Sequence, residues 1–310
     1  MAALTVSKED EKRVKGIGFL RNKGTDCFSG RVLTKSGKIT AEQQVTIGEA
    51  ARLYGNGIVL FTSRLCVEVQ GIPYEKIDEF CAYIAKAGLT TGGTGPKVRP
   101  IVSCKGTTCR FGLIDTQALA ERIHDRFFEG YKEVNLPHKF KIAVGGCPNN
   151  CVKPDLNDLG IMGQMFYDFD AEKCRGCKKC GVEKNCPADV AKVSEKVLAI
   201  DKDECLHCGR CVGNCYFDAL TGRTNGYQIY IGGRWGRKQI KGKKLSKIFS
   251  SEDEVLSVIE KAILLYKEQG KLRERFAQTV ERIGFEKAEA QLISDEILER
   301  KQEILDKDIC

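Results

Sequence analysis

The 310-residue sequence has no long apolar run. Its longest apolar stretches, such as Ile58–Phe61 and Val255–Tyr266, are short or interrupted by charge, whereas a membrane-spanning helix needs about 20 consecutive apolar residues. The first ten residues also lack the apolar core of a secretory signal. We therefore expect a cytoplasmic protein that neither enters a membrane nor is exported.

Motifs for nucleotide cofactors are absent as well. The Gly-rich segment 88–95 contains neither G-x-G-x-x-G nor G-x4-G-K-[ST] between a strand and a helix, and a linker is the simpler interpretation. With no flavin or NAD(P)H motif, the chain is expected to receive electrons from another protein or subunit. Histidine is scarce: of His124, His138 and His207, none has the context of a haem ligand, and His124 is expected on a helix surface.

Cysteine, by contrast, is abundant. The sequence has 16 cysteines, and in a chain that is not exported these indicate metal ligands rather than disulfides. Twelve of them form three quartets. Of the remaining four, Cys66 and Cys81 are expected to pack in the core, and no role is assigned to Cys27 or Cys310.

Two quartets form a compact block. The spacing Cys205-x2-Cys208-x2-Cys211-x3-Cys215 matches the bacterial two-cluster ferredoxin pattern, and a similar run from Cys174 has a longer last gap. In such folds the fourth cysteine of each run ligates the other cluster. We therefore predict two [4Fe–4S] clusters, one held by Cys174, Cys177, Cys180 and Cys215, the other by Cys186, Cys205, Cys208 and Cys211. A pair of zinc knuckles is the alternative, because Cys-x2-Cys pairs also bind Zn²⁺.

The formal net charge of +8 counts these cysteines as neutral. A [4Fe–4S] core with four thiolates carries about two negative charges, so three clusters would remove roughly six. The surplus of Lys and Arg is then available to anionic cofactors and substrate. Because the sequence has no basic stripe interleaved with aromatic residues, nucleic acid is not an expected partner.

Periodicity places the cysteine block inside a mixed α/β protein. Capping boxes predict helices starting at Thr46 and at Ser251, the second ending near Gly270. Further helices are expected over 73–87, 113–131, 271–283 and 285–309, and strands over 57–69, 98–104, 139–144 and 226–231. The fold class is therefore α+β. We predict an N-terminal unit (1–93), a second unit in two pieces (94–168 and 223–310), and an inserted ferredoxin-type domain (169–222).

The third quartet does not have ferredoxin spacing. Cys104-x4-Cys109 and Cys147-x3-Cys151 could hold a third relay cluster, a zinc ion or a catalytic cluster. The segments 103–112 and 145–151 resemble those of the sirohaem sulfite and nitrite reductase family, in which Cys-x5-Cys and Cys-x3-Cys hold a [4Fe–4S] cluster. The first gap is one residue shorter here. By that resemblance, Cys151 is the thiolate that bridges the cluster to the sirohaem iron.

The resemblance extends to four basic residues. Residues 61–64 look like the family's Thr-x-Arg strand, 98–104 like the strand with a second active-site arginine, and 136–141 like the segment with two lysines. If the roles of the family's residues are carried over to the matching positions, the resemblance implies that the substrate is surrounded by four basic residues: Arg64, Arg99, Lys139 and Lys141. Arg offers a fixed fork for an oxyanion, and Lys can also donate a proton. The alternative is that the lysines are solvated charges at a strand edge.

Together these features predict the catalytic subunit of a sulfite reductase similar to the dissimilatory, anaerobic enzymes, with sirohaem and three [4Fe–4S] clusters. It would reduce sulfite to sulfide with six electrons received through the insert. Nitrite reduction to ammonia and a haem-free polyferredoxin-like carrier are the alternatives. Larger members of the family contain two copies of the unit that this chain contains once. We therefore expect a homodimer, or a dimer-based oligomer, in which one chain's basic residues face the other's sirohaem.

Overall fold

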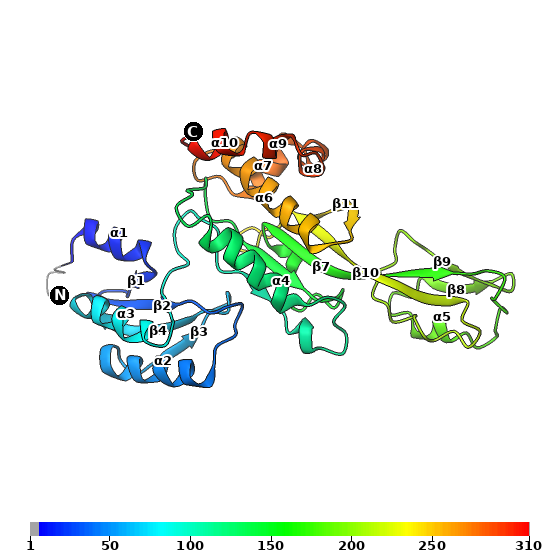
Figure 1. The fold of residues 1–310 in the computed structure, drawn as a ribbon, viewed down its shortest axis with the longest axis horizontal. Coiled ribbons are helices and arrows are strands. Elements are labelled where there is room, and N and C mark those ends of the chain that lie inside the picture. The colour runs from blue at the N-terminus through cyan, green and yellow to red at the C-terminus, as the bar shows by residue number, and fades with distance from the viewer. Residues whose placement is uncertain (1–5, 310) are drawn as a thin grey trace.

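The computed structural model describes residues 6–309, so Cys310 lies outside the described residues. The N-terminal part is a four-stranded antiparallel sheet in the order β1-β2-β4-β3 (Figure 1). Its apolar face packs against helices over a core that includes Phe19, Phe28 and Phe80. The strands are β1 (Phe19–Arg21), β2 (Cys27–Val32), β3 (Val59–Phe61) and β4 (Val67–Pro73), and the helices are α1 (Lys8–Gly16), α2 (Ala41–Tyr54), the 3₁₀ turn η1 (Tyr74–Lys76) and α3 (Ile77–Ala85).

Two sequence predictions in this part are wrong. Helix α2 starts at Ala41, because the capping box is formed by Thr40 and Gln43, while the Thr46 hydroxyl donates to Glu42 O within the helix. The strand predicted over 57–69 is the hairpin β3–β4. Its turn is closed by Thr62 N–H donating to Cys66 O at 2.8 Å, with Leu65 at φ 58°. Cys66 is buried and Cys81 packs against the same core, as expected.

The central part is a five-stranded sheet in the order β11-β10-β7-β6-β5. The pairs β5–β6 and β6–β7 are parallel, and β7–β10 and β10–β11 are antiparallel. A parallel bridge between Val98 and Phe140 extends the β5–β6 edge. The strands are β5 (Val102–Ser103), β6 (Ile142–Gly145), β7 (Leu159–Phe169), β10 (Leu220–Ile231) and β11 (Lys243–Phe249).

Helices cover this sheet and bury its core. The second capping-box prediction is confirmed: Ser251 and Glu254 cap the helix α6, which ends before Gly270. The helix predicted over 285–309 is broken at Ser294 and at Arg300. The helices are α4 (Thr116–Ile123) with a π-helical turn η3 (His124–Glu129), α6 (Glu252–Gln269), α7 (Phe276–Ile283), α8 (Phe285–Ile293), α9 (Glu296–Glu299) and α10 (Lys301–Asp306).

His124 is not on a helix surface, as the sequence predicted, but buried. The residue is 6% exposed and its ring stacks on Phe128 with centroids 4.8 Å apart. The widened η3 turn follows α4 directly at this position. His124 follows Thr116 and Ala120 at intervals of four residues, so it continues the buried face of α4.

The cysteine block lies between two long paired strands. In the pairing of β7 with β10, Leu159 lies opposite Ile231 at one end and Phe169 lies opposite Leu220 at the other. The chain between them, residues 170–219, contains α5 (Gly181–Asn185) and the hairpin β8 (Ala191–Ser194) and β9 (Val197–Ile200). Figure 1 shows this segment projecting from the end of the two strands, on the opposite side of the molecule from the N-terminal sheet. No helix within residues 6–309 is long and apolar enough to cross a membrane.

Candidate functional site

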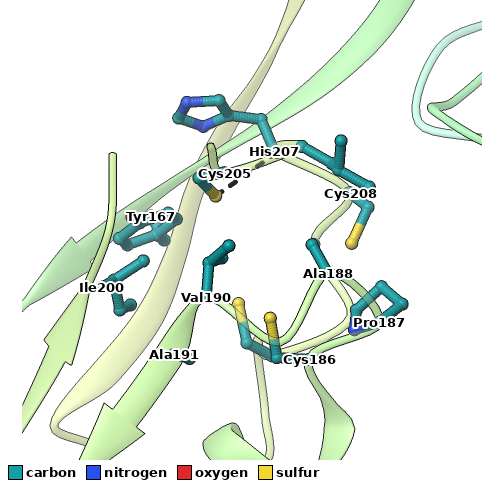
Figure 2. A pocket seen from close by; sticks show the side chains of 13 residues that line it. Tyr167, Cys186, Pro187, Ala188, Val190, Ala191, Ile200, Cys205, His207 and Cys208 are labelled. Atoms are coloured by element: carbon teal, nitrogen blue, oxygen red, sulfur yellow. Dashed lines mark hydrogen bonds between the residues drawn. The ribbon is translucent and has the colours of Figure 1, made fainter. Parts of the chain in front are cut away.

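One predicted cysteine set encloses a cavity in the segment between β7 and β10. Figure 2 shows Cys186, Cys205 and Cys208 with their sulfurs directed into this cavity, and Cys211 also lines it. These are the four cysteines assigned to one cluster from the ferredoxin pattern. The remaining wall is apolar and includes Pro187, Val190 and Ile200. Residues from two loops and from the strands β7, β8 and β9 thus converge on one small space.

The thiols of this set lie within electrostatic reach of one another. Burial raises the pKa of Cys211 to about 11, and charge on Cys208, Cys205 and Cys186 contributes to the rise. Backbone N–H groups compensate in part. His207 N–H donates to Cys205 Sγ at 3.4 Å, and the N–H groups of residues 188–191 outweigh burial and lower the pKa of Cys186. Such donors stabilise sulfur that carries negative charge, as it does when bound to iron.

The other set of the block packs against the same small core. Cys174, Cys180 and Cys215 contact a cluster of buried residues that includes Val182, Leu198 and Leu220. Leu198 N–H donates to Cys174 Sγ at 3.4 Å. Cys177, on the loop between Cys174 and Cys180, is half-buried. Cys186 and Cys211 of the first set contact the same core, so both sets are held by one compact segment.

The third quartet is positioned by the central sheet. Cys104 directly follows β5, and Cys147 lies two residues after β6, so the parallel strands bring both to one edge. Gly146 N–H donates to Cys104 Sγ at 3.2 Å. Burial raises the pKa of Cys147, and charge on Cys104, Cys151 and Cys109 raises it further. The four thiols are therefore neighbours, and Cys151 alone among them is exposed.

The sulfurs do not surround a single ion. Within residues 6–309, no group of three or more His, Cys, Asp or Glu side chains is close enough to enclose one metal ion. A zinc site draws its four ligands onto one atom. A [4Fe–4S] cluster instead attaches each thiolate to a different iron, so its four ligands stand further apart.

Arg64 reaches the central sheet from the turn of the β3–β4 hairpin. Its guanidinium donates to Pro100 O and Ile142 O of the β5 and β6 segments and, at 2.8 Å, to Asn157 Oδ1. Burial lowers the pKa of Arg64 to about 10, which leaves it charged at neutral pH. The turn that the sequence did not predict is thus what directs Arg64 into the site.

The other three predicted basic residues lie close by. Burial lowers the pKa of Lys141 to about 8, and the positive charges of Arg64, Lys139 and Arg275 add to the effect. Burial and the charges of Arg275 and Arg99 lower the pKa of Lys139. Within the described residues none of the four predicted basic side chains forms an ion pair with a carboxylate. The charge of one carboxylate, Asp158, acts on three of these four cations, so the group keeps an excess of positive charge and is suited to an anion.

A cavity of about 220 Å³ opens beside this basic group. Arg64 and Lys141 line one side and Val152 and Lys153, which follow Cys151, line another. Trp235 closes it, with its ring 5.6 Å from the Lys153 ammonium. The cavity therefore connects the basic residues to the chain segment of the exposed thiol.

A buried ion pair supports the basic group, and the sequence analysis missed it. The Arg275 guanidinium donates to both oxygens of Asp158, at 3.0 and 2.9 Å, and Asp158 also accepts the Lys141 backbone N–H at 2.9 Å. The Asp158 side chain is 0% exposed and that of Arg275 8%. The two residues are 117 positions apart and match no motif, so no sequence signal could have paired them.

Two family models match the chain. Residues 20–87 match the "Nitrite/Sulfite reductase ferredoxin-like half domain" and residues 94–301 match the "Nitrite and sulphite reductase 4Fe-4S domain". The chain belongs to the nitrite and sulphite reductase family. The family match covers most of the chain, including both cysteine regions and all four predicted basic residues.

Individual relatives of this nitrite and sulphite reductase family member include two proteins of Methanocaldococcus jannaschii. One is a "Coenzyme F420-dependent sulfite reductase", 34% identical over 258 residues, covering 82% of this chain but only 39% of the relative. The other is an uncharacterised protein, 35% identical over 261 residues and covering 84% of this chain and 89% of the relative. Among solved structures, dissimilatory sulfite reductase I aligns over 86% of this chain and 69% of its own, with a TM-score of 0.69 and 24% identity.

The two cysteine regions of this family member touch at one aromatic ring. Phe111, two residues after Cys109, lies between two guanidiniums, with Arg110 4.5 Å and Arg210 5.5 Å from its ring centroid. Arg210 immediately precedes Cys211. A second contact is the Met165 N–H of β7, which donates to His207 O at 2.8 Å. The Cys186/Cys205/Cys208/Cys211 set is thus the one that faces the third quartet.

Proposed function

We propose that this chain is the catalytic subunit of a sirohaem sulfite reductase that receives electrons through residues 170–219. The observation that carries the proposal is the group of unpaired cations beside the loop of Cys151. Reduction of hydrogensulfite to hydrogensulfide takes six electrons and six protons and releases three waters. A site for it must therefore hold an oxyanion, supply protons and connect to an electron source.

The residues present fit sirohaem, a macrocycle that carries several carboxylates. Arg64, Arg99, Lys139 and Lys141 lack carboxylate partners, and Arg99 Nε and Arg275 Nε are buried without a hydrogen-bond acceptor. Burying charged N–H donors of this kind costs free energy unless an anion accepts their hydrogen bonds. The exposed Cys151 would supply the thiolate next to the iron. When bound, sirohaem would supply the iron centre at which the sulfur of the substrate is reduced.

The basic residues differ in what they can do for the substrate. Of the five N–H donors of Arg64, four make hydrogen bonds to Pro100 O, Ile142 O and Asn157, which fixes the guanidinium and leaves one N–H for an oxyanion. Lys141, whose pKa is lowered to about 8, can both bind an anion and release a proton near neutral pH. Arg64 therefore orients the oxyanion, and Lys141 delivers protons.

We further propose that the site is completed by a second copy of the chain. Lys141 and Cys147 lie at opposite ends of β6. The four residues of this strand span about 13 Å. The cavity of about 220 Å³ beside Arg64 is smaller than the roughly 300–1,000 Å³ of ordinary ligand pockets. It suits a small anion better than a whole tetrapyrrole, so a dimer in which one chain's basic residues face the other's cofactor is the arrangement we favour.

Anaerobic purification with full cofactor loading tests the proposal. We expect sirohaem Soret and α bands, about twelve irons per chain in three clusters, and faster turnover with sulfite than with nitrite. Faster turnover with nitrite would assign the site to nitrite reduction. Loss of the sirohaem bands with the iron retained would contradict both enzymes and leave a three-cluster electron carrier.

A further inference from the structure

The outer flank of residues 170–219 combines exposed aromatic rings with unpaired cations. Tyr216 is 92% exposed and Phe217 42%, and the two rings pack edge to face with centroids 5.2 Å apart. An aromatic side chain this exposed loses the burial that normally stabilises it, and exposed aromatic residues of this kind are enriched where proteins bind one another. Tyr216 directly follows Cys215, a predicted ligand of the cluster that lies away from the third quartet.

Exposed basic residues lie on the segment 175–184, which contacts Asn214, two residues before Tyr216. Arg175, Lys178, Lys179 and Lys184 are all exposed, and within the described residues none of them forms an ion pair. Their segment is held against the loop before Cys215. Asn185 Nδ2 donates to Asn214 Oδ1 at 3.1 Å and to Gly181 O at 2.8 Å. At Gly181 a Cβ atom would lie 2.2 Å from Asn214 O, so the two segments are in backbone contact.

We propose that this surface, formed by Tyr216, Phe217, Arg175, Lys178, Lys179 and Lys184, is the docking site of an acidic electron-carrier protein. The inference rests on the proposed function, since it names where electrons enter the same relay. Positive charge on this rim fits a partner with negative charge around its redox group, and such complementarity raises the association rate. The aromatic pair would form the apolar centre of the contact, next to Cys215.

The orientation of residues 170–219 relative to the third quartet supports a docking site at Tyr216. The Cys186/Cys205/Cys208/Cys211 set faces the core through the contact of Arg210 with Phe111. The Cys174/Cys177/Cys180/Cys215 set lies beside the exposed rings instead. A carrier bound at Tyr216 would therefore reduce the outer cluster, and electrons would pass inward through the second cluster. Figure 1 shows α5, which follows Cys180, at the end of the molecule far from the N-terminal sheet.

Charge reversal on the loaded enzyme tests the proposal. The probes are a small acidic [4Fe–4S] ferredoxin and reduced methyl viologen, a small cation that needs no docking surface. In Lys178→Glu/Lys179→Glu, and separately in Tyr216→Ala, we expect the KM for ferredoxin to rise about tenfold, which corresponds to about 1.4 kcal/mol. Turnover with methyl viologen should be unchanged. The matched control is Lys12→Glu/Lys23→Glu, two exposed lysines on the N-terminal part.

Two outcomes would overturn the docking site. The first is a KM for ferredoxin that changes equally in the control and in the Lys178/Lys179 variant. The second is an unchanged KM with a shifted reduction potential of the outer cluster, which would mean that the lysines only offset the charge of their own cluster. Absence of sulfite reduction with methyl viologen in the unmodified enzyme would instead contradict the proposed function, so the two failures are distinguishable.

Discussion

Replacing Asp158 by Asn tests the structural support of the basic group. Asp158 is fully buried and is the carboxylate partner of Arg275, so the substitution leaves a nearly buried guanidinium without its counter-charge. Removing one partner of a buried pair costs about 3–5 kcal/mol of the free energy of unfolding. The Asn side chain can still accept the Lys141 N–H, so the loss measures chiefly the charge.

The assay is anaerobic unfolding of the loaded protein followed by circular dichroism. At about 1.5 °C per kcal/mol for a chain of this size, Asp158→Asn should lower the unfolding midpoint by roughly 4–8 °C. The control is Asp253→Asn, which breaks an exposed ion pair with Arg122. In this pair the Arg122 side chain is 46% exposed and the Asp253 side chain 85%. Exposed pairs are worth at most about 1 kcal/mol, so the midpoint should hardly move.

A double-variant cycle completes this test. Arg275→Gln alone should also destabilise the protein, and Asp158→Asn/Arg275→Gln should cost less than the sum of the single changes, by about 0.5–3 kcal/mol. The reasoning is refuted if Asp158→Asn costs no more than the exposed control. It is refuted equally if the two substitutions are additive, because the residues would then not act as a pair.

Three further predictions concern the site. Sulfite turnover should fall as the pH rises through about 8, since Lys141 then loses its proton; Lys141→Met should have a lower kcat and lack this decline, and a decline that persists in the variant would argue against Lys141. Cys205→Ala should remove about four irons per chain, measured by iron analysis and electron paramagnetic resonance, whereas Cys66→Ala, at a buried packing position, should retain them; equal iron loss in both would contradict the ligand assignment. Phe111→Leu removes cation–π contacts worth about 0.5–1 kcal/mol, which should loosen the contact between residues 205–211 and the third quartet, so electron transfer between them should slow at unchanged iron content; an unchanged rate in rapid-mixing experiments would exclude this contact as the junction.

Local features of the fold could be predicted from the sequence, and features set by packing could not. The capping box at Ser251 predicted α6 correctly, because a cap involves residues only three positions apart. The strand predicted over 57–69 failed because β-branched residues occur on both arms of the β3–β4 hairpin, and only the left-handed Leu65 marks the turn. His124 was expected on a surface because it is a polar residue type, whereas its spacing of four residues from Ala120 places it on the buried face of α4.

The sequence by itself determined the cysteine spacing and the family resemblance, because a motif depends only on residues that are close together along the chain. The position of the anion site was decided only by tertiary structure. Arg64 comes from the turn of an N-terminal hairpin, Lys141 from the start of β6 and Arg275 from the cap of α7. They meet around Asp158 because long-range packing closes the two sheets and the C-terminal helices onto one another, and no local pattern in the sequence encodes that meeting.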